Sequence, residues 1–399
     1  MELLSPAGDL NKLKYAVYYG ADAVYASGQY FGLRAKSTNF NREQLKKAVK
    51  FCHDHHRKIY VTVNIFALNR DIKALPEYLQ FLQSIQVDAL IISDPGVFAL
   101  AREYAPQIKI HVSTQANVTS WSAAKFWFDQ GAARIILARE LNIKDIAEIK
   151  QKVPEIELEI FVQGAMCMSY SGRCLISAFL NDRSANQGLC TQPCRWEYDL
   201  VERSRPGEQF RIEQDKYGSY FFNSKDLNLI NRIAEITELE LDSVKIEGRM
   251  KSIYYVAAVT RAYRSAIDIG NNKISDNIKN ELNKISHRRY SESFFNSNDS
   301  KKTQYYGSSA YIREYQFIGE ITKTIQQSAF IAIRSKFSVD DTLEFIFPDF
   351  EDDFQYTVKE IFDEENIAIQ SAKPNTTIRL DLDNKIPNWG IVRKKNNED

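Results

Sequence analysis

Residues 158–164 read LEIFVQG, and residues 165–198 continue as AMCMSYSGRCLISAFLNDRSANQGLCTQPCRWEY. The first seven residues form an alternating apolar run that ends in glycine, which predicts a strand. Four cysteines follow, separated by six, fifteen and three residues: Cys167, Cys174, Cys190 and Cys194. Small residues between them allow the backbone to fold tightly. The pattern therefore predicts a core strand that carries four thiols into one loop.

Three chemistries compete for these thiols: disulfide bonds, structural zinc and an iron–sulfur cluster. The first residues, MELLSPAGDL, have neither the basic region nor the long apolar region of a secretion signal, and a cytoplasmic chain keeps its thiols reduced. Zinc ribbons usually use two short cysteine pairs, whereas only Cys190 and Cys194 have that spacing. The loose spacing favours an iron–sulfur cluster, although spacing alone leaves zinc open.

Eight short apolar or β-branched runs alternate with helical patterns along the first two thirds of the chain. They are residues 2–7, 23–27, 59–65, 89–94, 109–115, 134–140, 158–164 and 243–248. Eight such units predict an α/β fold, a (β/α)8 TIM-like barrel at residues 1–275. An open doubly wound sheet is the alternative, but no G-x-G-x-x-G follows the first run. Residues 219–223 are predicted to pair with residues 196–202 as a hairpin, inserted with the cysteine loop at about residues 164–222.

The period of the hydrophobic pattern changes to two from Gln316 onward, where short alternating runs are separated by polar turns. This predicts a small all-β barrel at residues 314–399, acting as an accessory domain. Residues 276–313 are rich in Asn, Ser and Lys and are predicted to link the two domains. Cations and rings lie side by side in this segment, so it is the candidate RNA contact outside the barrel, with a solvated linker as the alternative. The residues concerned are His287, Arg288, Arg289, Tyr290, Phe294, Lys301 and Lys302.

In a (β/α)8 barrel the chemistry collects at the carboxyl ends of the strands, so polar residues that end the runs are the candidate substrate-binding residues. They are Asn64, Gln115, Asn117, Arg139, Glu140, Gln163, Lys245, Glu247 and Arg249, with Arg173 in the cysteine loop and Lys225 further along. An ordinary polar strand end is the alternative for each of them. We expect their convergence on one pocket, beside the cysteines.

The overall composition restricts the partners. The chain has 399 residues, 44% of them hydrophobic, which is enough for two domains. Its 52 basic and 52 acidic residues produce no overall field, so any RNA binding depends on a local basic patch. No apolar run approaches the roughly 20 residues that span a bilayer, and we expect a cytoplasmic protein without membrane contact. Cys52 recurs at helical spacing with Leu45, Ala48 and Val49, which predicts core packing rather than chemistry.

Residues 157–198 resemble the signature segment of peptidase family U32, the collagenase-like proteins. Four further stretches resemble the family in the same order, at residues 2–27, 112–127, 223–227 and 244–257. Together they are most similar to the branch of prephenate-dependent tRNA uridine hydroxylases. The resemblance implies a barrel and an iron–sulfur cluster, expected as 4Fe-4S, on the four cysteines. It also implies oxygen-independent hydroxylation of the wobble uridine in the tRNA anticodon region to 5-hydroxyuridine, with prephenate as co-substrate and oxygen donor.

Several readings of the function stay open beside the tRNA hydroxylase. One is a U32-type peptidase or collagenase, and another is a hydroxylase of ribosomal RNA or of a quinone precursor. A non-catalytic RNA-binding protein is a further alternative. The sequence contains neither H-E-x-x-H nor G-x-S-x-G, so no familiar protease motif accompanies the family name. A requirement for a paralogous protein partner is also open.

A dicarboxylate such as prephenate needs planar cationic partners, which guanidinium groups supply through paired hydrogen bonds. The candidates are Arg139, Arg173, Arg249 and the loop residue Arg34. Surface salt bridges are the alternative role for each. At the position of Gln163, resembling hydroxylases commonly have histidine. Glutamine retains the hydrogen bonding but cannot transfer protons near neutral pH, so we do not expect proton transfer there.

Overall fold

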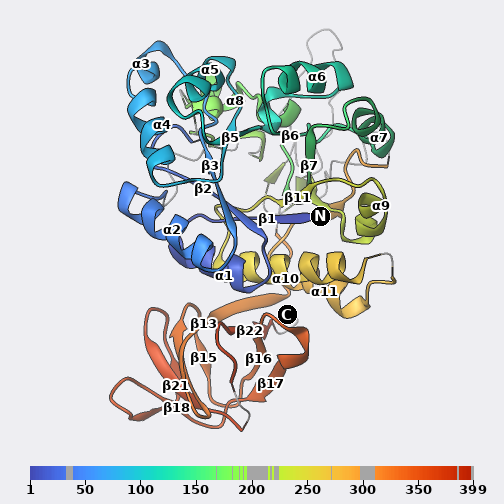
Figure 1. The fold of residues 1–399 in the computed structure, drawn as a ribbon. Coiled ribbons are helices and arrows are strands. Elements are labelled where there is room, and N and C mark those ends of the chain that lie inside the picture. The colour runs from blue at the N-terminus through green and yellow to red at the C-terminus, as the bar shows by residue number, and fades with distance from the viewer. Residues whose placement is uncertain are drawn as a thin grey trace.

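The computed structural model describes residues 1–32, 39–167, 169–181, 183–187, 189–191, 193–195, 214–215, 218–219, 224–270, 272–296, 311–383 and 386–396. Eight parallel strands close into a ring with helices outside it (Figure 1). They are β1 (Glu2–Pro6), β2 (Ala23–Ser27), β3 (Lys58–Thr62), β4 (Ala89–Ile92), β5 (Lys109–Val112), β6 (Arg134–Ile136), β7 (Glu157–Ala165) and β11 (Ser243–Ile246). Because β11 pairs with both β7 and β1, the ring is closed and the predicted barrel is confirmed.

Helices follow the strands and begin where the sequence supplies capping side chains. Asn41 accepts a hydrogen bond from the backbone of Gln44 before α2, and Asp94 caps α5 ahead of Pro95. The helices are α1 (Leu10–Tyr18), α2 (Arg42–Asp54), α3 (Asn69–Ile72), α4 (Leu75–Ser84), α5 (Pro95–Tyr104), α6 (Trp121–Asp129), α7 (Ile143–Lys152), α8 (Ile176–Asn181), α9 (Ile233–Glu238), α10 (Ile253–Ile269) and α11 (Asp276–Lys284). In the part of the chain that is described, none combines the length and the apolar character needed to cross a membrane.

Alternate residues of each strand point into the barrel, where an apolar cluster packs. Its members are Leu4, Ala23, Tyr25, Tyr60, Ala89, Ile91 and Ile136. Charged side chains accompany them: Arg134 contacts Glu2 at 2.5 Å and Glu159 at 3.1 Å, and Lys245 Nζ lies 3.1 Å from the other oxygen of Glu159. Burial lowers the pKa of Lys245 although Glu159 opposes it. The interior of this barrel is therefore partly ionic, and these four charged side chains form one network in which each has a partner of opposite sign.

Strand β7 extends beyond its neighbours and changes partner along one edge. Residues 159–163 pair in parallel with β11, whereas residues 163–165 pair antiparallel with β10 (Asp226–Asn228). Gly164 lies at this change of partner with a φ of +115°, and a Cβ there would lie 2.7 Å from both the Cβ and the O of Glu247. Glycine meets both conditions without strain. The strand thus leaves the ring and carries the chain to Cys167, and β12 (Tyr290–Ser291) pairs with the outer edge of β10.

The C-terminal domain is all-β with its own core, as predicted, but the described strand pairings form an antiparallel sheet rather than a closed barrel. Its strands are β13 (Tyr315–Ile325), β14 (Ser328–Ile333), β15 (Phe337–Ser338), β16 (Thr342–Ile346), β17 (Phe354–Thr357), β18 (Ile361–Phe362), β19 (Ala368–Ile369), β20 (Ser371–Ala372), β21 (Thr377–Asp381) and β22 (Ile391–Lys395). Eight of them form one sheet in the order β17-β16-β22-β13-β14-β21-β18-β19, and β15 pairs with β20. The Tyr356 hydroxyl on β17 donates to the backbone oxygen of Asp381 on β21, which helps to curl the sheet.

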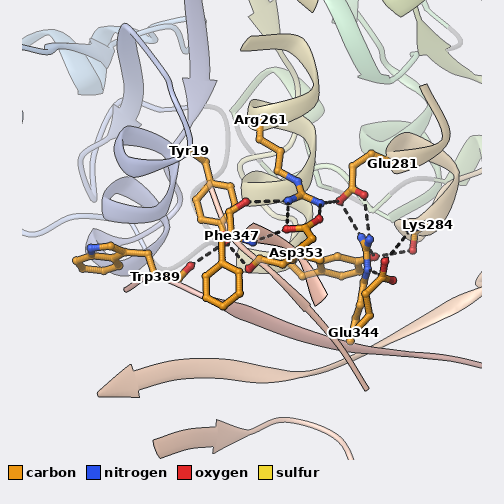
Figure 2. Close-up of polar contacts among 11 residues, drawn as sticks. Tyr19, Arg261, Glu281, Lys284, Glu344, Phe347, Asp353 and Trp389 are labelled. Atoms are coloured by element: carbon orange, nitrogen blue, oxygen red, sulfur yellow. Dashed lines mark hydrogen bonds and ion pairs between the residues drawn. The ribbon is translucent and has the colours of Figure 1, made fainter. Parts of the chain in front are cut away.

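The two domains meet at a buried cluster of charges between α10, α11 and the C-terminal sheet (Figure 2). Glu281 lies 2.9 Å from Arg261 and 2.7 Å from Arg393, and all three side chains are at most 1% exposed. Arg261 also binds Asp353 at 2.8 Å, and Arg393 binds Glu344 at 2.9 Å. Each guanidinium thus has two carboxylate partners from different elements.

Aromatic contacts extend the same interface toward α1. The Tyr19 hydroxyl donates to the backbone oxygens of Ile346, at 3.1 Å, and Trp389, at 2.8 Å. The Tyr18 and Trp389 rings stack with their centroids 4.0 Å apart. Figure 1 shows the C-terminal domain against α1, α10 and α11, with α8 on the far side of the barrel. The docked domain therefore lies away from the end of the barrel that carries the cysteines.

The predicted linker and the cysteine insertion both contain regular structure that the sequence pattern did not predict. The segment predicted as a linker at residues 276–313 begins with α11, whose Leu282 belongs to the same buried core as the barrel. The boundary itself stays a prediction. In the cysteine insertion, β8 (Gln214–Asp215) pairs with β9 (Gly218–Ser219). The predicted pairing of residues 219–223 with residues 196–202 falls outside the described residues.

The first prediction concerns Gly164. Gly164→Ala should destabilise the protein by more than the roughly 1–3 kcal/mol of a strained backbone conformation, because the added methyl also meets Glu247. Gly270→Ala is the matched control, since Gly270 has a φ of +63° and no atom within 4 Å of an added Cβ. Urea unfolding of both variants gives the comparison. Equal losses of stability in the two variants would contradict the role assigned to Gly164.

The second prediction concerns Glu281. Burial alone would raise the pKa of Glu281, but Arg261 and Arg393 outweigh burial and lower it. Its stabilising effect is then fully present above pH 4.5, the ordinary glutamate value, and disappears as the pH falls through the lowered pKa. Glu281→Gln should cost about 3–5 kcal/mol at pH 7 and should flatten this acid dependence.

Urea unfolding between pH 7 and pH 3 measures both effects. Asp353 affects the pH dependence of stability in the opposite direction, because burial raises its pKa. Its protonation in acid therefore offsets part of the stability that is lost at Glu281. Glu235→Gln is the control, since Glu235 pairs with Arg232 on the half-exposed surface and should change stability by less than about 1 kcal/mol. A Glu281→Gln protein as stable as this control would refute the prediction.

Candidate active site at the mouth of the barrel

The carboxyl ends of β3 and β5 meet through a shared glutamine. Asn64 donates its amide hydrogen to Gln115 Oε1 at 2.9 Å, and the Ser113 hydroxyl donates to the same oxygen at 3.0 Å. Arg173, from the cysteine loop, donates through Nε to the backbone oxygen of Gln115 at 2.9 Å. Three residues expected at one pocket, Asn64, Gln115 and Arg173, are therefore in contact.

A second contact joins the end of β6 to the cysteine loop. Glu140 accepts hydrogen bonds from the backbone N of Ser171, at 2.6 Å, and from the Ser171 hydroxyl, at 2.5 Å. Arg139 donates to the backbone oxygen of Ala165 at 2.7 Å, and its guanidinium carbon lies 3.9 Å from the centroid of the Phe161 ring. Arg139 Nε is buried and has no hydrogen-bond partner among the described residues. Glu140 thus anchors the loop, while Arg139 keeps a buried donor at the mouth.

Gln163 lies at the point where β7 meets β10. The Tyr263 hydroxyl oxygen lies 2.7 Å from the backbone oxygen of Val162 and 3.1 Å from Gln163 Oε1, and it accepts from the backbone N of Leu229 at 3.2 Å. Burial raises the pKa of Tyr263, so its hydroxyl remains a donor. The Asn228 amide oxygen lies 3.4 Å from the same hydroxyl. Gln163 is therefore held in a buried hydrogen-bonded group that fixes the strand junction.

The remaining candidates on β11 and its following loop lie at different depths. Lys245 is inside the barrel, with Nζ 4.5 Å from the centroid of the Tyr25 ring and 5.5 Å from that of Phe161. Arg249 is buried and donates to the Thr62 hydroxyl at 3.2 Å. Glu247 lies against Gly164 and accepts from the backbone N of Ala165 at 3.4 Å. Arg249 and Glu247 thus join the mouth, whereas Lys245 lies beneath it.

Two further candidates have contrasting positions. Asn117 adopts a left-handed conformation, with φ of +56°, after the 3-10 helix η1 (Thr114–Ala116). Its Oδ1 is buried and has no hydrogen-bond partner in the part of the chain that the structure describes. Asn117 therefore offers a buried acceptor at the end of β5. Arg34, named as a candidate carboxylate partner, lies outside the described residues.

Lys225 lies next to a buried ion pair between Asp226 and Arg288. Arg288 binds Asp226 through NH2 at 2.6 Å and Nε at 3.1 Å, and both side chains are buried. Arg288 was predicted as an RNA contact, but the ion pair with Asp226 keeps it inside the protein. Lys225 and Arg289 instead line a pocket with Tyr290. Lys301 and Lys302, from the same predicted contact, lie outside the described residues.

The four cysteines of the loop differ in exposure. Cys167 and Cys190 are exposed, and Cys174 and Cys194 are partly buried. The segments that carry Cys174 and Cys190 are held together because the Ser177 hydroxyl on α8 accepts from the backbone N of Thr191 at 3.0 Å. Among the residues that are described, no three His, Cys, Asp or Glu side chains gather as a metal-ligand set. Cysteine thiolates are the donors that an iron–sulfur cluster requires, and the convergence of these four stays a prediction.

Cys52 differs from these four. It is fully buried on the apolar face of α2 with Leu45, Ala48 and Val49, which confirms the predicted core packing. Burial raises the pKa of its thiol to about 12, so it remains protonated at neutral pH. Cys52 therefore has no chemical role in common with the loop cysteines.

Sequence reasoning missed the residues that hold the candidates in place. Ser171 and Tyr263 form the central hydrogen bonds of two of these groups, and Thr62 binds Arg249. The sequence pattern marks Ser171 only as one of the small residues between the cysteines. A tyrosine on a long apolar helix is a usable signal, because a buried phenol hydroxyl needs a partner.

The chain matches known proteins along nearly its whole length. Residues 8–305 match peptidase family U32, and residues 313–393 match the peptidase family U32 C-terminal domain. The tRNA hydroxylation protein P of Haemophilus influenzae is 38% identical over 93% of this chain and 90% of its own length. The tRNA hydroxylation protein P1 of Bacillus subtilis is 38% identical over 98% of this chain and 94% of its own.

A 23S rRNA 5-hydroxycytidine synthase of Escherichia coli is 36% identical over 67% of this chain, but over only 39% of its own length. The first two relatives therefore correspond to this chain almost from end to end, whereas the third shares only a part. The family match covers the barrel, the cysteine loop and the C-terminal sheet. This chain belongs to peptidase family U32.

Proposed function

We propose that this protein is an RNA-modifying hydroxylase that converts the wobble uridine of tRNA to 5-hydroxyuridine without molecular oxygen. Prephenate is the proposed oxygen donor, and an iron–sulfur cluster on the loop cysteines is the proposed cofactor. Two relatives that match nearly the whole chain are named as tRNA hydroxylation proteins, which supports tRNA as the substrate. The proposed location is the cytoplasm, where tRNA is modified.

The observation that carries this proposal is the path of β7. This strand leaves the ring at Gly164 and delivers Cys167 to the carboxyl end of the barrel, where (β/α)8 enzymes hold their substrates. Two residues of the loop then bind back to the mouth, Ser171 to Glu140 and Arg173 to Gln115. The cysteine loop is thereby fixed to the rim of the barrel, beside the candidate substrate-binding residues.

The four thiols would hold the cluster through Cys167, Cys174, Cys190 and Cys194 as thiolates. Such a cluster supplies one-electron transfer at the barrel mouth when it is bound. The protein would contribute a loop that hydrogen bonds already bring together, between Ser177 and Thr191 and between Asn186 and the backbone oxygen of Cys174. With all four thiols used as ligands, no loop cysteine remains as a nucleophile.

The donor site needs cations that face a dicarboxylate. The net reaction replaces the hydrogen at C5 of uridine by a hydroxyl, so the donor must deliver one oxygen atom and accept two electrons. Arg139 and Arg249 reach the mouth from β6 and from the loop after β11, and Arg173 reaches it from the cysteine loop. Guanidinium groups on separate elements suit two separate carboxylates. Gln163 positions the strand junction and takes no part in proton transfer.

Ribosomal RNA is the alternative substrate class, because one relative is named as an rRNA hydroxycytidine synthase. A peptidase is the alternative that the family name suggests, and a quinone-precursor hydroxylase is a further one. These alternatives differ in their products, so one analysis of modified nucleosides and one protease assay separate them. The need for a paralogous partner protein remains a separate question for the same strains.

The third prediction concerns the cysteines. Alanine at any of Cys167, Cys174, Cys190 or Cys194 should remove or destabilise the cluster and abolish hydroxylation, because each thiolate is a ligand. Cys52→Ala is the control and should keep the full cluster, with only a small loss of stability from the packing defect. Iron, acid-labile sulfide and zinc are measured after anaerobic purification. Stoichiometric zinc without sulfide, or an intact cluster in the Cys174→Ala protein, would overturn the assignment.

The fourth prediction concerns the product and the donor. Deletion of the gene should remove 5-hydroxyuridine and its derivatives from total tRNA, as measured by nucleoside mass spectrometry. A strain whose pathway is blocked before prephenate should show the same loss. A precursor that enters the pathway after the blocked step should restore the nucleoside. The purified protein should not cleave gelatin or peptides. Unchanged 5-hydroxyuridine in the blocked strain would refute prephenate as donor, and cleavage abolished by a single substitution would favour the peptidase.

A further inference from the structure

A pocket of about 540 Å³ lies beside the base of the cysteine loop, outside the ring of barrel strands. Its described lining comes from three parts of the chain: the residue before β10, the segment from α11 to β12, and Ile312, which precedes the C-terminal domain. The lining residues are Lys225, Asn283, His287, Arg289, Tyr290 and Ile312. None of the roles assigned so far at the barrel mouth uses this pocket.

The strand pairings fix the position of the pocket relative to the cysteines. Asp226 on β10 is paired with Ala165 at the end of β7, and Tyr290 on β12 is paired with Asp226. Because β10 is antiparallel to β7, Lys225 lies on the side of this pair toward Cys167. The pocket is therefore next to the cysteine loop and two strands outside the barrel.

The charge of the described lining distinguishes this pocket from a second hollow on the described surface. That second hollow, of about 640 Å³, has Arg264 between the carboxylates of Asp22 and Asp268, at 2.8 and 2.5 Å. Among the residues that the structure describes, the lining of the pocket beside the cysteine loop includes the cations Lys225 and Arg289 and no carboxylate. Asp226, next in the chain to Lys225, is buried and bound by Arg288.

One wall of the pocket is a rigid aromatic pair. The His287 and Tyr290 rings lie parallel, with centroids 4.2 Å apart and planes 4° apart. The Tyr290 hydroxyl donates to the backbone oxygen of Leu282 at 2.7 Å, and His287 Nδ1 lies 2.6 Å from the backbone oxygen of Arg288. Burial lowers the pKa of His287, so its ring is neutral at pH 7. The wall is therefore flat, uncharged and fixed at both rings.

Two cations beside a flat, neutral wall are the features that proteins use to hold the backbone of a nucleic acid. We propose that this pocket binds a phosphodiester of the RNA substrate between Lys225 and Arg289, next to the nucleotide that reacts at the barrel mouth. This inference rests on the proposed function, because it assumes an RNA substrate. A carboxylate of the small-molecule donor has similar chemistry, but the donor must reach the reacting base, and the pocket lies two strands away from the ring.

The experiment measures tRNA binding without turnover, by fluorescence anisotropy over a range of salt concentrations. Lys225→Ala and Arg289→Ala should each weaken binding roughly tenfold, as expected when one charged hydrogen bond is lost. Each should also reduce the slope of log affinity against log salt by about 1. Arg289→Lys retains the positive charge and should retain the slope. Lys109→Ala is the control, because Lys109 is exposed at the amino end of β5, at the opposite end of the barrel.

Unchanged affinity and slope in both alanine variants, with thermal melting equal to the wild type, would overturn the proposal. So would unchanged tRNA affinity with a raised KM for prephenate, which would assign the pocket to the donor. The hydroxylase proposal is tested separately, by 5-hydroxyuridine in cellular tRNA. A wild-type protein that binds tRNA through these residues but forms no 5-hydroxyuridine would refute the hydroxylase and leave the phosphate site standing.

Discussion

The change of partner along β7 is the constraint on which the mouth of this barrel depends. A parallel ring is complete once β11 pairs with β7 and β1, yet β7 continues past the ring and needs another neighbour for its free edge. β10 supplies that edge, and the Tyr263 hydroxyl joins the two strands at Val162 and Leu229. The cysteine loop, Glu247 and the β12 strand all take their positions from this junction.

Buried charge is the second constraint, and it extends from the interior of the barrel to its mouth. Lys245 and Arg139 contact the ring of the same residue, Phe161, while Lys245 also pairs with Glu159 and Glu159 with Arg134. Charges in such a position are tolerated when each has a partner of opposite sign, and loss of one partner leaves an uncompensated charge. The electrostatics of the mouth are therefore connected to residues well below it, so substitutions inside the barrel are expected to influence substrate binding.

The sequence allowed the fold to be predicted because the signals for it are local. Each of the eight strand runs is a short apolar segment, and the change to a period of two after Gln316 indicates the C-terminal sheet directly. The partners of polar residues are different, because they come from distant parts of the chain. Glu140 meets Ser171, and Asp226 meets Arg288, which only the folded topology brings together. The sequence pattern therefore predicted Arg288 as a surface cation, although it is buried against Asp226.

The ion cluster between the domains has a consequence for motion. Arg261 and Arg393 each bind two carboxylates in this cluster. A small separation of the two domains would leave these buried charges without partners, which opposes the separation. Domains joined only by polar surfaces move as the default, whereas this interface favours a single rigid body. We therefore expect the C-terminal domain to keep its position relative to the barrel when an RNA strand binds. Any conformational change on binding would then occur in the loops at the carboxyl end of the barrel.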